Sequence, residues 1–227
     1  MAEFERFPKT PHLCWLGQGE PRDDKVLVAP EAADFLTHTV IVEEKVDGAN
    51  LGFSVDDDGV LQAQNRGNYL AMDALAGQWK PLRGWLQRRN VDLAGALFPS
   101  LMLFGEWCYA VHSLRYTDLP DWFLVFDVFD RVEKRFWSSE RRDALAAELG
   151  FAVVPGLGSG RFTIDDLLRI SERSRLRAGS AEGVYLRREE GGALVTRAKL
   201  VRPEFVQAIG DHWSGRMLET NGLRAGP

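Results

Sequence analysis

The sequence predicts an α+β fold, in which antiparallel sheets are flanked by helices. Apolar and β-branched segments come in neighbouring pairs, and segments with helical character lie between these pairs instead of alternating with single strands. This order favours antiparallel hairpins over repeated β-α-β units. Of the 227 residues, 45% are hydrophobic and 27% are charged, which is typical of a globular protein. We therefore expect residues 1–227 to form a single domain.

The N-terminal half predicts strands wherever β-branched residues or an apolar alternation occur. Residues 39–46 are rich in β-branched side chains, and residues 49–55 alternate apolar side chains on one face. An Asp-rich turn ending in Gly59 joins this second strand to a partner, as in a hairpin. The expected elements are strands at 39–46, 49–55, 60–65 and 101–107, with a helical region at 72–98 that breaks or restarts near Pro81.

Helices in the C-terminal half carry recognisable start and stop signals. Ser138 or Ser139 can cap a helix that Gly150 ends, and Thr163 with Asp166 can cap another. A closing helix is expected to start at Pro203 and to continue toward His212-Trp213-Ser214.

Strands in this half are predicted by apolar runs. Residues 122–129 are nearly all apolar, which indicates a strand buried on both faces. Asp127 lies inside this run, where a buried carboxylate without a partner would be costly. Residues 184–186 and 194–201 are expected to pair around the Gly191-Gly192 turn, and residues 221–227 are expected to form a frayed tail.

Composition and charge exclude several classes of protein. No run of about 18 apolar residues indicates a membrane span, and the charged N-terminus lacks the apolar segment of a secretion signal. Cys14 and Cys108 are the only cysteines, which is too few for a disulfide framework and indicates a reducing, cytoplasmic setting. The net charge of −5 argues mildly against a large DNA-binding surface, although local groups of arginines can still hold phosphates.

The strongest local signal for chemistry is Lys45, which follows two acids at the end of an apolar strand and precedes an Asp-Gly turn. A lysine amine with an ordinary pKa of about 10.4 is protonated at neutral pH and is a poor nucleophile. Burial in a cleft and nearby cations would shift Lys45 toward the free amine, and Gly48 would permit close approach of a ligand. Taken alone, the Lys-x-Asp-Gly pattern fits an exposed hairpin turn with a solvated lysine equally well.

Further motifs follow Lys45 in a fixed order and favour the nucleophile over the exposed turn. The series is Lys45-Val46-Asp47-Gly48, Gln64-Asn65-Arg66-Gly67, Phe104-Gly105-Glu106-Trp107, Phe123-Leu124-Val125-Phe126-Asp127-Val128, Glu182-Gly183-Val184-Tyr185-Leu186-Arg187 and Arg197-Ala198-Lys199-Leu200-Val201. With these motifs the sequence resembles the covalent nucleotidyltransferase superfamily of RNA ligases, DNA ligases and mRNA capping enzymes. The resemblance implies an ATP-grasp-like nucleotidyltransferase fold, with the nucleotide in a cleft between the sheets.

The resemblance implies nucleophilic and cationic roles for four residues. Lys45 would take AMP from ATP, Lys199 would hold the α-phosphate, and Arg66 would grip a phosphate, such as the 5′-phosphate of the second substrate. These three residues are the candidate catalytic residues. Arg197 would also belong to the nucleotide site, at a position where RNA ligases carry lysine; arginine keeps the charge but changes its geometry.

The resemblance also implies an acidic part and an aromatic part of the site. Glu106 would contact the ribose or a metal, and Glu182 would help to hold Mg²⁺ or Mn²⁺. Phe126 would stack on adenine, Glu44 would accept a hydrogen bond from the adenine amino group, and Asn50 would complete the nucleotide-binding set. Without the series of motifs, Phe126 would by default be a core residue.

Within the superfamily, the sequence is most similar to the RNA ligase 2 branch and its small bacterial and phage relatives. The similarity includes the stretches at 7–13 and 106–113. DNA ligases and capping enzymes normally add an OB-fold domain after the last lysine motif, whereas only 28 residues (200–227) follow Lys199 here. We therefore expect one adenylyltransferase domain without a C-terminal OB-fold.

The implied activity is that of an ATP-dependent RNA ligase, which joins 3′-OH and 5′-phosphate ends of RNA through a lysyl-AMP on Lys45 and an adenylated 5′ end. A minimal ATP-dependent DNA ligase that seals nicks is one alternative. Another is a non-catalytic nucleic-acid-binding module derived from a ligase, although such a module would be expected to lose Lys45, Glu182 or Lys199. An end-healing kinase or phosphatase is a candidate partner.

Overall fold

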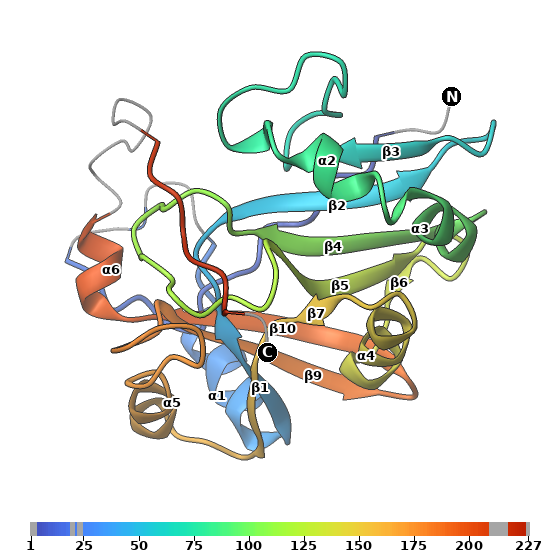
Figure 1. Ribbon diagram of the computed structural model, residues 1–227. Coiled ribbons are helices and arrows are strands. Elements are labelled where there is room, and N and C mark those ends of the chain that lie inside the picture. The colour runs from blue at the N-terminus through green and yellow to red at the C-terminus, as the bar shows by residue number, and fades with distance from the viewer. Residues whose placement is uncertain (1–3, 19–20, 22–24, 209–217, 226–227) are drawn as a thin grey trace.

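Two sheets form the framework of the computed structural model, which describes residues 4–18, 21, 25–208 and 218–225 (Figure 1). The first sheet has the strand order β10-β9-β1-β8, and the second has the order β3-β2-β4-β5-β6, with β7 added to β5 in parallel. All other pairings are antiparallel, so the predicted α+β class is confirmed. The strands are β1 (Val40–Lys45), β2 (Ala49–Val55), β3 (Leu61–Gln64), β4 (Leu101–Trp107), β5 (Phe123–Asp130), β6 (Arg135–Phe136), β7 (Ala152–Val153), β8 (Gly156–Gly160), β9 (Gly183–Glu190) and β10 (Ala193–Val201).

Short helices pack against both sheets. In Figure 1, α2 and α3 lie over the second sheet, whereas α1 and α5 lie beside the first. None of the helices within the described ranges is long and apolar enough to span a bilayer. The helices are α1 (Ala29–Thr37), the 3-10 helix η1 (Gly77–Trp79), α2 (Leu82–Leu86), α3 (Asn90–Leu97), α4 (Ser139–Glu148), α5 (Ile164–Ile170) and α6 (Pro203–Ala208).

Each sheet has its own apolar core. Phe35 of α1 and Leu167 of α5 pack against Val42 of the first sheet, while Trp85 of α2 stacks beside Phe53 of the second. Each fully buried large apolar side chain of this kind contributes about 1.5–3 kcal/mol through its removal from water. Two smaller apolar clusters of buried residues pack in addition to these cores.

A buried ion network joins the two sheets. Arg187 on β9 donates to Asp127 of β5 at 2.6 Å, and Arg197 on β10 reaches the other oxygen of Asp127 at 2.8 Å. Arg142 of α4 pairs with Glu43 of β1 at 2.6 Å. Except for Arg197, these side chains are at most 2% exposed. The partner expected for a buried Asp127 is thus present, and the network fixes the spacing between the sheets.

Most of the predicted elements are present, and their starts follow the expected local chemistry. Ser138 caps α4 by accepting from the Arg141 amide, and Thr163 with Asp166 forms a capping box at α5. The β9–β10 hairpin turns through Gly191 and Gly192, whose φ angles are 57° and 75°, a region that glycine enters without strain. α6 begins at Pro203 as predicted, whereas His212-Trp213-Ser214 lies outside the described residues.

Three expectations need correction. The helical region predicted at 72–98 consists of η1, α2 and α3, each of no more than eight residues. The elements α1, β6, β7 and β8 were not predicted; β8 contains three glycines, which have low strand propensity. The predicted frayed tail is wrong for residues 221–225, because Asn221 is 4% exposed and makes several hydrogen bonds.

Candidate active site

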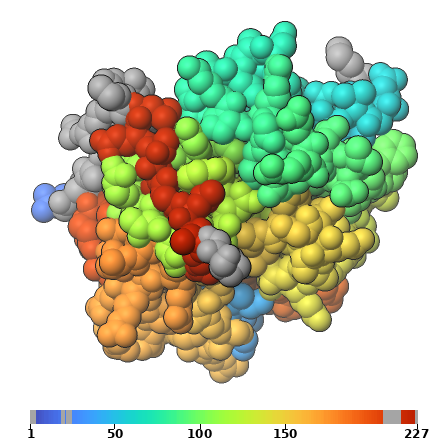
Figure 2. Space-filling view, in the orientation of Figure 1, coloured from blue at the N-terminus to red at the C-terminus, as the bar shows by residue number. Residues whose placement is uncertain are grey.

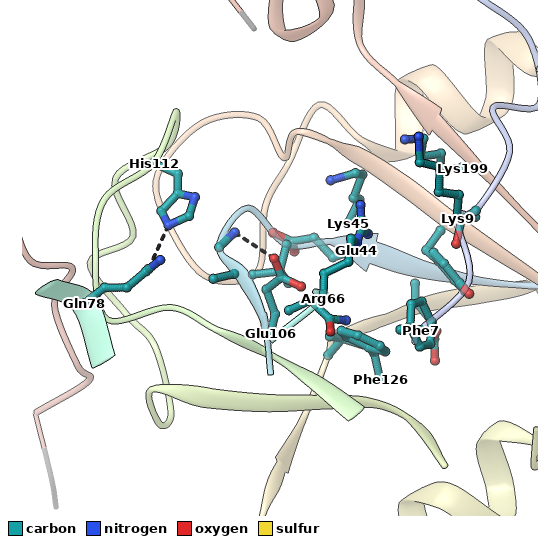
Figure 3. A pocket seen from close by; sticks show the side chains of 18 residues that line it. Phe7, Lys9, Glu44, Lys45, Arg66, Gln78, Glu106, His112, Phe126 and Lys199 are labelled. Carbon is teal, nitrogen blue, oxygen red and sulfur yellow. Dashed lines mark hydrogen bonds between the residues drawn. The ribbon is translucent and has the colours of Figure 1, made fainter. Parts of the chain in front are cut away.

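A pocket of about 670 Å³ is lined by residues from both sheets and from the N-terminal segment (Figure 3). It includes seven of the residues that the sequence assigned to a nucleotide site, and an eighth, Glu182, contacts its wall. The seven are Glu44, Lys45, Asn50, Arg66, Glu106, Phe126 and Lys199. Residues more than 150 positions apart in the sequence are therefore brought to one place by the pairing of β1 with β9 and of β2 with β4.

Lys45 ends β1, and its amine lies 2.6 Å from Glu182 Oε2. The register of β1 against β9 places Lys45 opposite Gly183. A Cβ at Gly183 would collide with the Leu200 carbonyl of β10, so only glycine permits this close approach next to Glu182. The Glu-Gly motif therefore has a steric reason as well as a chemical one.

The charge state of Lys45 differs from the sequence-based expectation. Burial acts to lower the pKa of Lys45, but the carboxylates of Glu182, Glu106 and Asp47 outweigh it, and the pKa lies above the ordinary lysine value. The expected shift toward the free amine is therefore wrong for the protein without ligands. Lys45 is an ammonium group held by Glu182, and its proton must leave before the nitrogen can act as a nucleophile.

Two glutamates supply hard oxygen atoms next to Lys45. Burial raises the pKa of Glu106 to about 7, and burial also raises the pKa of Glu182, with Asp47 adding to both shifts. Glu106 accepts from the Gly48 amide at 3.0 Å. No group of three or more metal-ligating side chains occurs in the described part of the chain. Mg²⁺, however, commonly uses one or two carboxylates plus water and phosphate oxygens, so this pair fits a divalent cation.

Cationic groups lie along the rest of the pocket. Lys199 is held in place through its backbone, because its amide donates to Pro11 O at 2.9 Å and its carbonyl accepts from the Leu13 amide at 2.8 Å. Figure 3 shows Lys9, from the same N-terminal segment, near Lys199. Arg66 lies on the turn after β3, is exposed, and forms no hydrogen bond or ion pair with the described residues.

The aromatic part of the pocket contains Phe126 and Phe7, whose ring centroids are 5.1 Å apart. Asn50 also lines the pocket, and its Oδ1 is buried without a hydrogen-bond partner among the described residues. Glu44 differs, because its two oxygens already accept from the Ser174 hydroxyl at 2.5 Å and the Arg175 amide at 2.7 Å. An adenine amino group at Glu44 would have to share one of these oxygens.

Comparison with protein families decides which family the chain represents. Residues 38–201 match the family model described as RNA ligase. The chain belongs to the RNA ligase family. The match covers the whole series from Lys45 to Lys199, so the motifs and the family model agree on the same part of the chain. None of the curated proteins that were compared matches the sequence.

Solved structures similar to this RNA ligase-family chain include several from Naegleria gruberi RNA ligase. An apo variant has a TM-score of 0.60 and 19% identity over 79% of this chain and 54% of its own. A variant with ATP and Mn has a TM-score of 0.65 and 17% identity over 92% of this chain and 59% of its own. A third, with AMP and Mn, has a TM-score of 0.64 and 16% identity over 90% and 58%. The chain thus shares their fold and spans a little over half of their length.

Arg197 is placed differently from the other predicted site residues of this RNA ligase-family chain. It is absent from the pocket lining, and its guanidinium donates to Asp127 and contacts Tyr185 Oη at 3.2 Å. The same group lies over the ring of Phe136, 4.0 Å from its centroid. Its observed contacts belong to the ion network, and direct contact with a nucleotide remains a prediction.

Sequence reasoning missed several pocket residues. Lys9, Gln78, His112 and Tyr185 line the pocket, and His112 Nε2 lies 3.0 Å from Gln78 Oε1 (Figure 3). The stretches around Lys9 and His112 were recognised as family-like, but no side chain in them was assigned a role. A motif comparison could have included them, whereas Gln78 lies in a region without a motif and only the fold places it here.

Asp47 was also given no role, although it holds the turn after Lys45. Its Oδ2 accepts from the amides of Ser113 at 2.6 Å and Leu114 at 2.7 Å, and its own amide donates to Tyr116 Oη at 2.8 Å. These partners lie in the loop between β4 and β5. The Asp of the Lys-x-Asp-Gly motif thus fixes the end of β1 against that loop.

Proposed function

We propose that this RNA ligase-family chain joins RNA ends with ATP, and that Lys45 carries the AMP. The observation that supports this most is the placement of Lys45 in a nucleotide-sized pocket, beside the carboxylates of Glu182 and Glu106 and together with the cationic side chains that line it. Glu182 and Glu106 would meet the cation that accompanies ATP, and Lys199 would face the phosphates. The pocket therefore has a charge pattern suited to a metal-triphosphate complex.

In the first step, Lys45 Nζ would attack the α-phosphorus of ATP, forming a P–N bond while pyrophosphate leaves. Lys45 must first lose a proton to solvent, a loss that its ion pair with Glu182 Oε2 at 2.6 Å opposes. A divalent cation on Glu106 and Glu182 would neutralise the carboxylates that hold the ammonium form and would polarise the phosphates. Lys199 would stabilise the negative charge that develops on the α-phosphate.

In the second step, an oxygen of the RNA 5′-phosphate would attack the AMP phosphorus, and the Lys45 amine would leave. In the third, the 3′-hydroxyl oxygen would attack the 5′-phosphorus, forming a phosphodiester and releasing AMP. Arg66 would bind the 5′-phosphate, because its planar guanidinium is exposed at the pocket and is not paired with a described carboxylate.

The adenine would lie at Phe126, with Phe7 closing the aromatic end of the pocket. Asn50 Oδ1, which is buried and makes no hydrogen bond to the described residues, would gain one from the nucleotide. Glu44 would offer a remaining lone pair to the adenine amino group, since each carboxylate oxygen can accept more than one hydrogen bond. These contacts would select ATP over other nucleotides.

The cellular role would be RNA repair in the cytoplasm, where ATP and Mg²⁺ are supplied. Cys14 and Cys108 are free thiols, which suits a reducing compartment. An end-healing kinase or phosphatase would be the natural partner, because the reaction needs a 5′-phosphate and a 3′-hydroxyl.

The test compares nucleotides and then substrates. With Mg²⁺, we expect α-labelled ATP to label the protein covalently and labelled GTP to leave it unlabelled. We then expect a nick with RNA strands to be sealed faster than a DNA nick of the same sequence. Faster DNA sealing would favour a minimal DNA ligase, and nucleic-acid binding without any labelling would favour a non-catalytic module.

A further inference from the structure

The C-terminal segment at residues 218–225 lies along the loop between β4 and β5, at residues 108–122. Bridges join Thr220 to Ala110 and Leu223 to Leu119, and the Arg224 amide donates to Leu119 O at 2.8 Å. Figure 1 shows this segment crossing the loop, and Figure 2 shows it lying on the surface over the same region. The segment is therefore an integral part of the loop's structure.

Asn221 is the centre of this contact and is 4% exposed. Its Nδ2 donates to Cys108 O at 2.8 Å and to Ala110 O at 3.0 Å, while its Oδ1 accepts from the Tyr116 amide at 2.8 Å. A neutral amide provides two donors and an acceptor in one plane, a combination that aspartate and leucine lack. Asn221 thus joins the beginning of the loop to its far side.

The residue that Asn221 binds on the far side also contacts the lysine turn. Tyr116 is fully buried, and its hydroxyl accepts from the Asp47 amide at 2.8 Å. The amides of Ser113 and Leu114 bind the Asp47 carboxylate. A continuous series of hydrogen bonds therefore runs from Asn221 through Tyr116 to Asp47, two residues from Lys45.

We propose that Asn221 is a positioning residue for Lys45, acting through Tyr116 and Asp47. The inference rests on the proposed function, because it concerns the attack of Lys45 on ATP. Asn221 does not line the pocket, so it affects the direction of the Lys45 amine and not the binding of the nucleotide. A displacement of about 1 Å in a reacting group can lower a rate roughly a hundredfold, so a small shift of the turn is sufficient.

The test measures single-turnover self-adenylation over a range of ATP concentrations for Asn221→Ala and for Tyr116→Phe, which removes only one hydroxyl. We expect each to lower the maximal rate constant roughly ten- to a hundredfold while the ATP concentration at half-maximal rate changes less than about twofold. Arg224→Ala is the matched control, because its ion pair with Asp118 is exposed on the same segment. It should stay within about twofold of the unsubstituted protein.

A double substitution separates positioning from general destabilisation. If Asn221 acts through Tyr116, the combined variant should be little slower than the slower single variant, since both break the same path. If the double variant lost rate by the product of the two single losses, the proposal would be overturned. An unchanged maximal rate constant in Tyr116→Phe would also overturn it. If the unsubstituted protein were not labelled by ATP, the proposed function would fail instead, which keeps the two failures distinct.

Discussion

Two clusters of charged residues lie between the same pair of sheets, one around Asp127 and the other around Lys45. In the first, Arg187 and Arg197 share Asp127, and Arg142 pairs with Glu43. In the second, the carboxylates of Glu182, Glu106 and Asp47 all act on the single ammonium of Lys45. In the first cluster, each carboxylate named here is paired with an arginine. In the second, three carboxylates surround one central ammonium group, which cannot balance their charge.

This difference distinguishes a structural network from a binding site. A buried charge network whose members are paired with one another holds parts of the fold together. Burial, to which the neighbouring carboxylate of Asp47 adds, raises the pKa values of Glu106 and Glu182, and their oxygen atoms at the pocket suit a divalent cation. Both clusters combine carboxylates with basic side chains, so the balance of charge distinguishes their roles.

The largest expected effect is a loss of stability when the ion network around Asp127 is disrupted. Arg187→Met should lower the free energy of unfolding by about 3–5 kcal/mol, because it leaves the buried Asp127 carboxylate short of a partner. Arg188→Met, on the next residue of β9 and paired with an exposed Glu190, should cost about 1 kcal/mol or less. Urea denaturation measures the free energy of unfolding of both variants. Equal losses would contradict the assignment of a stabilising role to the buried network.

A second effect concerns Arg66, which pairs with no carboxylate in the described part of the chain. Arg66→Ala should slow AMP transfer to RNA about 10- to 100-fold, the loss expected for a charged hydrogen bond to phosphate. Self-adenylation should change much less, since Arg66 is assigned to the second substrate. Arg88→Ala, an exposed arginine outside the pocket, is the control. Equal losses in both steps would contradict the role given to Arg66.

A third effect is the pH dependence caused by Glu106. Its pKa of about 7 in the folded protein lies above the ordinary value of 4.5, so the folded state binds this proton more tightly. The contribution of Glu106 to the free energy of unfolding is fully present below about pH 4.5 and is lost as the pH rises to about 7. Glu106→Gln cannot ionise and should flatten this decline by roughly 1.4 kcal/mol for each pH unit between the two pKa values. Parallel stability curves for the two proteins would refute the raised pKa.

Local sequence signals predicted much of the fold. β2 and β4 have the predicted bounds, and the caps at Ser138 and Thr163 are where the residue types indicated. Such features depend on neighbouring residues only. β8 was missed because its glycines give no strand signal and it is stabilised by pairing with β1. The ordered segment around Asn221 was missed because its hydrogen bonds reach residues about 110 positions away.

In the candidate site, too, local features were predictable and features that depend on distant contacts were not. The residue types around Lys45 were predicted from motifs, and the fold gathers all of them but Arg197 at one pocket or its wall. The predicted direction of the shift in the Lys45 pKa was wrong, because the shift depends on how closely the carboxylates of Glu106 and Glu182 approach the Lys45 amine. Distances of that kind result from strand register, which no single motif contains.

The most direct measurement locates the AMP. The protein is incubated with ATP and Mg²⁺, digested, and analysed by tandem mass spectrometry, with Lys45→Ala as the comparison and Lys134→Ala as an exposed-lysine control. AMP should be found on Lys45 in the unsubstituted protein and in Lys134→Ala, and on no residue of Lys45→Ala. AMP on a different residue, or RNA sealing by a folded Lys45→Ala protein, would contradict the assignment of Lys45 as the nucleophile.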